Sequence, residues 1–409
     1  MSQYFGGLDF GSSGARISII SNTKDLIYAK SSKYEFSFQS PKSWINSCES
    51  LLYNLPTELK TKLSRISISG TSGTLLACQS NGMPLGDSIP YNQICNKQIE
   101  KLVVIANNDE NLKSPFSSLS KALTLVDKYG TDIILRHQSD WISGWILNNW
   151  KYGEEGNNIK LGWNISKRSW PENFESIGWR NCLPIIVKSG SLLGKINQSL
   201  ASKLKVNKNL LIVAGTTDSN ASFIAAGVNT DEGLTVLGTT LVLKKNIKKP
   251  IKHVGITSHR INDQWICGGS SNAGCGVLSK FFSDMQIEEL SKQINPHIKT
   301  NLNFIPLNCK GERFPTNNPL MEPLLKPRPV SDALFLQGIL EGLAAIELKG
   351  WKKLEKITGS YPKRIITIGG GAKNSQWRAI RRRILNIPIT SSNKSTSYGS
   401  ALIALSSKK

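Results

Sequence analysis

The sequence predicts an α/β protein of two domains. Strand, glycine-rich turn and helix follow one another repeatedly along its 409 residues, and this alternation is typical of α/β folds. A hairpin at residues 8–19 has a counterpart at residues 234–243, with the same order of strand, glycine with hydroxyl residues, and strand. The repeat indicates an internally duplicated chain.

The charge is strongly positive, with 51 Lys and Arg against 29 Asp and Glu, a net +22. The basic residues are spread along the chain, and no zinc-finger spacing or RNA-recognition signature is present. We therefore expect no nucleic-acid partner, and interpret Arg381, Arg382 and Arg383 mainly as the solvated face of a helix. A basic nucleic-acid binder remains the alternative, and it predicts retention that falls steeply with salt.

The seven cysteines are scattered and form no CxxC pair, so we expect neither a disulfide framework nor a metal site built on them. The N-terminus lacks a basic segment followed by an apolar one, and no stretch approaches 18 uninterrupted apolar residues. These features predict a cytoplasmic protein with no membrane partner.

The first motif is YFGGLDFGSSGARISII, Tyr4 to Ile20, which predicts a strand, a tight turn and a second strand. Leu8 and Phe10 bracket Asp9, so the acid points to the opposite face of the strand. Gly11, Ser12 and Ser13 form a turn whose N–H and hydroxyl groups can approach an anion closely. An ordinary hairpin with an exposed acid is the alternative.

The second motif is LLIVAGTTDSNASFIAAG, residues 210–227, predicted as a buried strand, a Gly-Thr-Thr turn and a tightly packed helix. Asp218 is the one charged residue between Leu210 and Val228. A lone carboxylate among small apolar residues costs desolvation energy unless something uses it. The alternative is a helix N-cap made by Asp218 or Ser219.

Three further loops are candidate ligand sites. Gly70 to Thr74 follow a predicted strand and could contact a sugar or form a plain turn. SSNAGCG, residues 270–276, precedes a predicted helix from Val277, and its small residues allow close ligand approach. Three consecutive glycines, residues 369–371, also favour backbone contact with a ligand, and Trp377 could offer its face to a base.

In order, DFGSSGAR, GTTDSNAS, LGTTLVLK and GGGAKN together resemble the FGGY family of carbohydrate kinases. The resemblance covers nearly the whole chain, and it is closest to a short cyanobacterial and plant branch that is similar to ribulose and xylulose kinases. It implies a two-domain actin/Hsp70-like (ribonuclease H-like) ATPase fold with a cleft between domains. We expect domains at residues 1–228 and 229–409, with a final helix at about 395–409 packing back on the first.

The resemblance also implies roles for individual residues. Asp218 would be the catalytic base, Asp9 and Asp218 would meet Mg²⁺, and Asp9, Ser72 and Asp218 would bind the sugar. ATP would be bound by Gly11, Ser12, Ser13, Gly238, Thr239, Thr240, Asn272, Gly274, Gly369, Gly370, Asn374 and Trp377.

The sequence departs from the family in two places. Position 12 is Ser where the family usually has Thr, and residues 70–74 lack the Gln-Gln-His-Gly type of many xylulose and glycerol kinases. The expected activity is ATP-dependent transfer of the γ-phosphate to a terminal hydroxyl of a small ketose, D-ribulose first, in a monomer or homodimer. A xylulokinase-type or other polyol kinase is one alternative, and an actin-like ATPase or binding module without sugar transfer is another.

Overall fold

The computed structural model describes residues 3–106, 109–261 and 263–407. It separates into two compact units: Met1–Ala225 with Arg260–Asp263 and Lys394–Lys409, and Ala226–His259 with Gln264–Asn393. The sequence placed the division after residue 228. The predicted final helix is α13, Thr396–Ser406, and it belongs to the first unit; its predicted last residues, 408–409, lie outside the described ones.

The main sheet of the first unit has the strand order β3-β2-β1-β4-β10-β9. Its strands are β1 Tyr4–Phe10, β2 Gly14–Ile20, β3 Leu26–Lys33, β4 Leu63–Gly70, β9 Leu192–Lys195 and β10 Leu211–Thr217. β1 is antiparallel to β2 and parallel to β4, and β4 is parallel to β10. β9 pairs only with β10 in this order and is an edge strand of the sheet.

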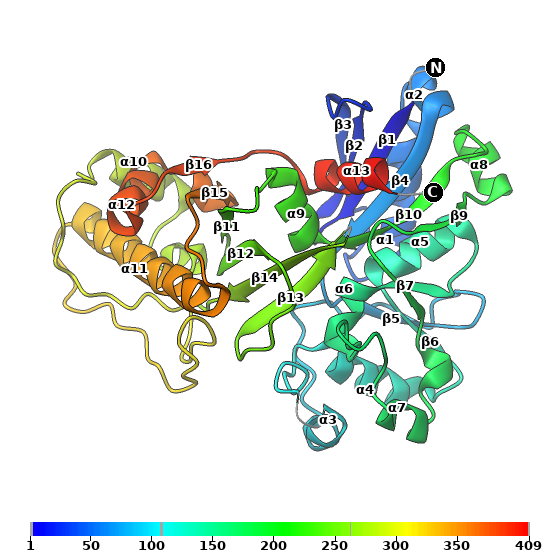
Figure 1. Ribbon diagram of the computed structural model, residues 1–409, viewed down its shortest axis with the longest axis horizontal. Coiled ribbons are helices and arrows are strands. Elements are labelled where there is room, and N and C mark those ends of the chain that lie inside the picture. The colour runs from blue at the N-terminus through cyan, green and yellow to red at the C-terminus, as the bar shows by residue number, and fades with distance from the viewer. Residues whose placement is uncertain (1–2, 107–108, 262, 408–409) are drawn as a thin grey trace. The chain divides into compact units, whose positions relative to one another are not determined.

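The helices of the first unit cover this sheet. They include α1 Pro41–Tyr53, α2 Thr57–Lys62, α5 Gln138–Leu147, α8 Gln198–Leu204 and α9 Asp218–Ala226. Leu8 and Phe10 pack in one core cluster with Trp44 of α1 and Trp141 of α5. On the other side of β1, α13 comes so close that a Cβ at Gly7 would meet Ser397 O at 2.1 Å; Figure 1 shows α13 against these strands.

Smaller elements of the first unit follow β4 in the chain. They are β5 Leu75–Cys78, α3 Ile99–Ala106, α4 Ser118–Tyr129, β6 Ile134–His137, β7 Tyr152–Glu154, α6 Glu155–Asn158, α7 Asn173–Ser176 and β8 Ile185–Val187, with 3-10 turns at Ile159–Leu161 and Arg180–Cys182. β5 pairs with β6, and β7 pairs with β8. Because β6 leads directly into α5, these elements fix where α5 begins.

The main sheet of the second unit has the order β13-β14-β12-β11-β15-β16. Its elements are β11 Glu232–Leu237, β12 Leu241–Ile247, β13 Ile256–Ile261, β14 Gln264–Ser270, α10 Asp284–Lys292, α11 Asp332–Thr358, β15 Arg364–Ile368, α12 Ser375–Leu385 and β16 Ile389–Ser391, with 3-10 turns at Cys275–Lys280 and Gly370–Lys373. The helix predicted from Val277 is thus a 3-10 segment.

The two sheets repeat one topology. In the first, β1 lies between antiparallel β2 and parallel β4; in the second, β11 lies between antiparallel β12 and parallel β15. β10 then continues the first sheet in parallel, as β16 continues the second. The duplication predicted from the two hairpins is therefore present in the strand order.

The prediction of a solvated face for all three arginines of α12 was wrong for Arg381. Its side chain is 1% exposed and donates from Nε to Glu347 Oε2 at 2.6 Å and from Nη2 to Oε1 at 2.7 Å. Arg382 and Arg383 also bond protein acceptors, Ile389 O and Glu341 Oε1. Within the described ranges, no helix is both long and apolar enough to cross a bilayer.

Candidate functional site

Three parallel strands of the first unit end in register at one edge. Phe10 of β1 and Thr217 of β10 both pair with Gly70 of β4. The residues that follow these strand ends are Gly11, Thr71 and Asp218. Carboxyl ends of parallel strands are where open α/β sheets bind ligands. The three sequence motifs of this unit therefore meet at one edge of the sheet.

Asp9 is buried beside this edge, with 2% of its surface exposed. Its Oδ2 accepts a hydrogen bond from Arg16 Nη1 at 3.2 Å, while Oδ1 has no hydrogen-bond partner among the described residues. Burial and the charge of Asp218 raise the pKa of Asp9 to about 7, against the opposing effect of Arg16. Asp9 and Asp218 thus lie close enough for each charge to influence the other.

The turn after Asp9 leaves room for a ligand. Gly11 N donates to Gly14 O at 3.0 Å, which closes the turn. A Cβ at Gly11 would come no closer than 3.4 Å to a described atom, so packing does not demand glycine there. Ser12 and Ser13 are exposed, so their hydroxyls and N–H groups face solvent and can reach an anion.

Asp218 is the first residue of α9. The Gly-Thr-Thr segment predicted as a turn belongs to β10, because the strand continues to Thr217. Thr217 Oγ1 accepts from Asn220 N at 3.3 Å, while Asp218 Oδ1 accepts from Ser219 N at 2.6 Å. The hydroxyl of Thr217 therefore caps the main-chain N–H of Asn220 in α9, and the carboxylate of Asp218 is not needed for that cap.

Mg²⁺ fits this pair of carboxylates. The ion usually keeps part of its water shell and takes one or two protein carboxylates together with substrate phosphates. Asp9 Oδ1, buried and without a partner in the described part of the chain, is an oxygen that a cation would satisfy. The described residues contain no group of three or more His, Cys, Asp or Glu able to hold a metal, so phosphate and water would complete the shell.

The Gly70–Thr74 loop is held by residues that the sequence analysis did not identify. Gln138 Oε1 accepts from Thr71 N at 2.9 Å and from Thr71 Oγ1 at 2.8 Å. Lys160 Nζ donates to Ser72 O at 3.3 Å. Ser72 itself is half-buried at the loop's apex. Gln138 opens α5, and its contact with Thr71 spans 67 positions.

The second unit carries the other turn predicted to bind phosphate, Gly238, Thr239 and Thr240, directly after β11. A Cβ at Gly238 would meet its nearest described atom at 3.7 Å, which leaves this position open as at Gly11. Gly274 has a φ of 153°, and a Cβ there would meet Thr239 O at 2.5 Å. The predicted nucleotide residue Gly274 thus packs directly against the turn, and its glycine is explained by that contact.

The three glycines at 369–371 lie beside the same turn and differ from one another. A Cβ at Gly369 would meet Leu237 O at 2.5 Å, and one at Gly371 would meet the Trp377 ring at 2.5 Å. Gly370 is exposed, and no described atom lies within 4 Å of a Cβ there. Packing explains two of the three glycines, and Gly370 is the position free for a ligand.

Three other predicted nucleotide residues have internal partners. Asn374 caps α12, accepting from Trp377 N at 2.9 Å and donating to Ser291 Oγ at 2.8 Å. Asn272 Nδ2 donates to Gly311 O at 2.8 Å. Trp377 is 2% exposed and packs in the core cluster of this unit, so its ring presents no free face to a base in this structure.

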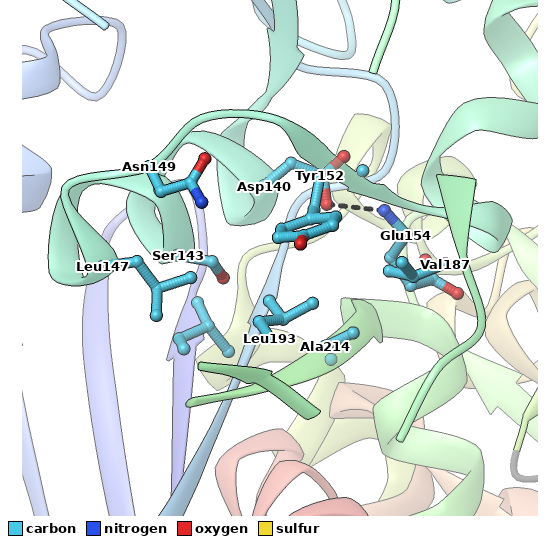
Figure 2. A pocket seen from close by; sticks show the side chains of 13 residues that line it. Asp140, Ser143, Leu147, Asn149, Tyr152, Glu154, Val187, Leu193 and Ala214 are labelled. Carbon is cyan, nitrogen blue, oxygen red and sulfur yellow. Dashed lines mark hydrogen bonds between the residues drawn. The ribbon is translucent and has the colours of Figure 1, made fainter. Parts of the chain in front are cut away.

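Figure 2 shows a polar cavity of about 10 Å³ between α5, β7 and the sheet of the first unit. This is room for about one water molecule. Asp140 and Glu154 line it, with Glu154 N donating to Asp140 Oδ1 at 3.0 Å. Burial raises the pKa of Asp140 to about 7 and that of Glu154 well above its usual value. Asp9, Ser72 and Asp218 are not among its lining residues, so we assign it a structural role.

Comparison with known families matches residues 234–407 to the FGGY family of carbohydrate kinases, C-terminal domain. The match begins in β11 and extends through α13. Xylulose kinases from Lactococcus lactis subsp. lactis (strain IL1403) and Staphylococcus epidermidis (strain ATCC 12228 / FDA PCI 1200) are 23% and 25% identical to this chain. They cover 94% and 97% of it, and the chain covers 83% and 86% of theirs.

Among solved structures, the fold is similar to that of a Brucella ovis protein described as a xyloylose kinase. The TM-score is 0.86 at 19% identity, over 98% of this chain and 90% of that one. The FGGY match, the kinase relatives and the shared fold together support a sugar phosphotransferase of the actin/Hsp70-like ATPase fold. The two xylulose kinases and the Brucella ovis structure agree with the motif-based resemblance over nearly the whole chain.

Proposed function

We propose that this protein transfers the γ-phosphate of ATP to a terminal hydroxyl of a small ketose. The observation that carries the proposal is the common edge at which β1, β4 and β10 end, since it gathers Asp9, the Ser72 loop and Asp218. The second unit contributes two open glycines, Gly238 and Gly370, in loops suited to a nucleotide. The FGGY match covers those loops.

In the proposed reaction, the terminal hydroxyl oxygen of the ketose attacks the γ-phosphorus in line. The new O–P bond forms as the bond between the γ-phosphorus and the β,γ-bridging oxygen breaks, and ADP leaves. Asp218 accepts the hydroxyl proton, a role worth on the order of 10²- to 10⁴-fold in rate. Mg²⁺, when bound with ATP, neutralises phosphate charge near Asp9.

D-ribulose and D-xylulose are the acceptors that we propose. The short-branch resemblance of DFGSSGAR favours ribulose, while the curated relatives are named xylulose kinases. Both sugars are small neutral 2-ketoses with a terminal hydroxyl, and they differ in the configuration of one carbon. The edge formed by Asp9, Ser72 and Asp218 offers groups that can bond sugar hydroxyls.

The test is ADP release with Mg²⁺-ATP and D-ribulose, L-ribulose, D-xylulose, L-xylulose, glycerol or no sugar. The proposal predicts strong stimulation by one of the two D-ketopentoses. Asp218→Asn should abolish that stimulation, whereas Asp231→Asn, the same change at an exposed ion-paired residue of the second unit, should retain it. A rate that no sugar changes would instead indicate an ATPase or binding module.

A further inference from the structure

Gln138 forms hydrogen bonds with both ends of the loop that carries Ser72. It is the first residue of α5 and is fully buried. Its side-chain Oε1 accepts from the N–H and the hydroxyl of Thr71, at 2.9 and 2.8 Å. Its own main-chain N–H donates to Thr74 O at 3.2 Å. One residue therefore fixes both the entry and the exit of the Thr71–Thr74 loop.

The contact is close enough to constrain the sequence of the loop. A Cβ at Gly70 would lie 2.9 Å from Gln138 Oε1, so a larger residue there would displace the carboxamide. Thr71 Oγ1 and Thr74 Oγ1 lie 2.6 Å apart, and Thr74 Oγ1 accepts from Tyr91 N at 3.2 Å. The loop is thus a closed hydrogen-bonded unit whose centre is the Gln138 oxygen.

The other end of the same side chain is unsatisfied. Gln138 Nε2 is buried and has no hydrogen-bond partner within residues 3–106, 109–261 and 263–407. A primary amide nitrogen carries two donors, and leaving a buried donor unpaired is costly. Such a group in a folded protein calls for an explanation, one of which is a ligand that is bound during function.

Gln138 Nε2 lies toward the edge of the sheet that carries Asp9 and Asp218. Burial and the charge of Asp9 raise the pKa of the Tyr34 phenol, whereas a hydrogen-bonding interaction with the Gln138 side chain lowers it. One hydrogen of Gln138 Nε2 therefore faces Tyr34 Oη without forming a close hydrogen bond. Tyr34 Oη donates to Gly11 O at 2.8 Å, in the turn after Asp9. Gln138 therefore stands between the Ser72 loop and the Asp9–Gly11 turn, which are the two parts that the proposed reaction must bring to one sugar.

We propose that Gln138 is the residue that positions the acceptor sugar. Its Oε1 holds the Thr71–Thr74 loop in the shape that presents Ser72, and its Nε2 donates the hydrogen that does not face Tyr34 to an oxygen of the bound ketose. This inference rests on the proposed kinase function and adds a specificity-determining residue to it. The ligand it takes is a neutral polyol or ketose oxygen that can accept a hydrogen bond.

The test uses four variants of the full-length chain. Gln138→Met removes both ends of the carboxamide at similar size, and Thr71→Val removes one bond to Oε1 while keeping Nε2. Thr71→Ser keeps the hydroxyl and is the conservative rescue. Gln337→Met is the matched control, because Gln337 is a buried glutamine of the second unit whose amide bonds the main-chain oxygens of Asn295 and Ile298.

We expect Gln138→Met to raise the KM for the ketose about tenfold or more, while the KM for ATP stays within about twofold. Thr71→Val should raise the ketose KM about threefold, and Thr71→Ser and Gln337→Met should leave it unchanged. Amide exchange over residues 70–75 should quicken in Gln138→Met, since the N–H of Thr71 loses its acceptor.

A ketose KM within twofold of wild type in Gln138→Met, or an equal rise in Gln337→Met, overturns the inference. If Gln138→Met does not fold, the two Thr71 variants decide. A ketose KM that is raised in Thr71→Val and equal to wild type in Thr71→Ser supports the inference, and equal KM values in the two variants refute it. Failure of the kinase function itself is separate, because it appears in the wild-type protein as a rate that no ketose stimulates, and the inference then falls with it.

Discussion

Asp9 and Arg16 face each other directly across the β1–β2 pair, and Arg16 Nη1 lies 3.2 Å from Asp9 Oδ2. The arginine side chain is 45% exposed and the carboxylate 3%. Arg16 thus brings a partly solvated positive charge to a carboxylate that burial and Asp218 hold near a pKa of about 7. Arg16 therefore favours the ionised form of Asp9, the form that can meet a cation, against the larger opposing effects of burial and Asp218.

Removal of that charge should shift the metal dependence to higher pH. Arg16→Met should raise the pKa of Asp9 above about 7, because Arg16 lowers it through both its charge and its hydrogen bond. The apparent Mg²⁺ constant, measured from pH 6 to 9 in the ADP-release assay, should then reach its plateau at a higher pH than in wild type. Lys62→Met is the control, because it changes a lysine paired with Glu58 on α2. If the pH midpoint of the Mg²⁺ dependence does not move in Arg16→Met, the effect assigned to Arg16 is contradicted.

Asp9→Asn should stabilise the folded protein while impairing its activity. The pKa of Asp9 in the folded protein, about 7, lies above the ordinary value of 3.8 for an aspartate. Its contribution to stability is therefore full below pH 3.8 and is lost as pH rises through 7. At pH 8 the buried charge costs on the order of 2–4 kcal/mol, which Asn removes. The melting temperature of Asp9→Asn relative to wild type should therefore be higher at pH 8 than at pH 4.5, with activity greatly reduced. A difference in melting temperature that does not change with pH would show that Asp9 ionises normally.

The buried pair of Glu347 and Arg381 should couple strongly. Glu347 Oε1 also accepts from Thr235 Oγ1 at 2.6 Å, and Arg381 Nη1 donates to Thr367 Oγ1 at 2.8 Å, which ties α11 and α12 to β11 and β15. Arg381→Leu or Glu347→Leu alone should lower the unfolding free energy by about 3–5 kcal/mol, since each leaves a buried charge unpaired. The double variant should lose far less than the sum in urea unfolding; additive losses would show that the pair is not coupled.

Substitution by alanine should have different effects on the melting temperature at Gly370 and at Gly371. Gly370→Ala adds a methyl group to open space, so the melting temperature should stay within about 1–2 °C of wild type, while the KM for ATP rises if a phosphate or base approaches there. Gly371→Ala places a methyl group 2.5 Å from the Trp377 ring and 2.9 Å from Leu237 Cβ, so it should lower the melting temperature. Wild-type ATP kinetics in Gly370→Ala would remove that residue from the nucleotide site.

Local patterns in the sequence were enough to predict the repeated hairpin and the final helix α13. Alternation of residues and capping signals act over a few positions, so they can be read directly from the chain. The strand that carries Asp9 follows from the same local patterns, whereas the strand before Asp218 continues to Thr217 through the segment predicted as a Gly-Thr-Thr turn.

Long-range contacts explain what the sequence did not reveal. Arg381 looks like a surface residue beside Arg382 and Arg383, and only the distant Glu347 gives it a buried partner. Gly369 and Gly371 look like ligand glycines, yet Leu237 and Trp377 require them. Gln138 meets Thr71 across 67 positions, and no pattern of spacing marks that contact.

The most direct measurement of the central claim is the phosphorus NMR spectrum of the reaction products, with Mg²⁺-ATP and D-ribulose or D-xylulose, for wild type and Asp218→Asn. The account predicts that wild type forms a phosphomonoester on the terminal carbon of one ketose, with one ADP released for each phosphomonoester formed. Asp218→Asn should form neither the phosphomonoester nor ADP above background. ADP accompanied by inorganic phosphate alone, or a phosphorylated ketose formed at the wild-type rate by Asp218→Asn, would contradict it.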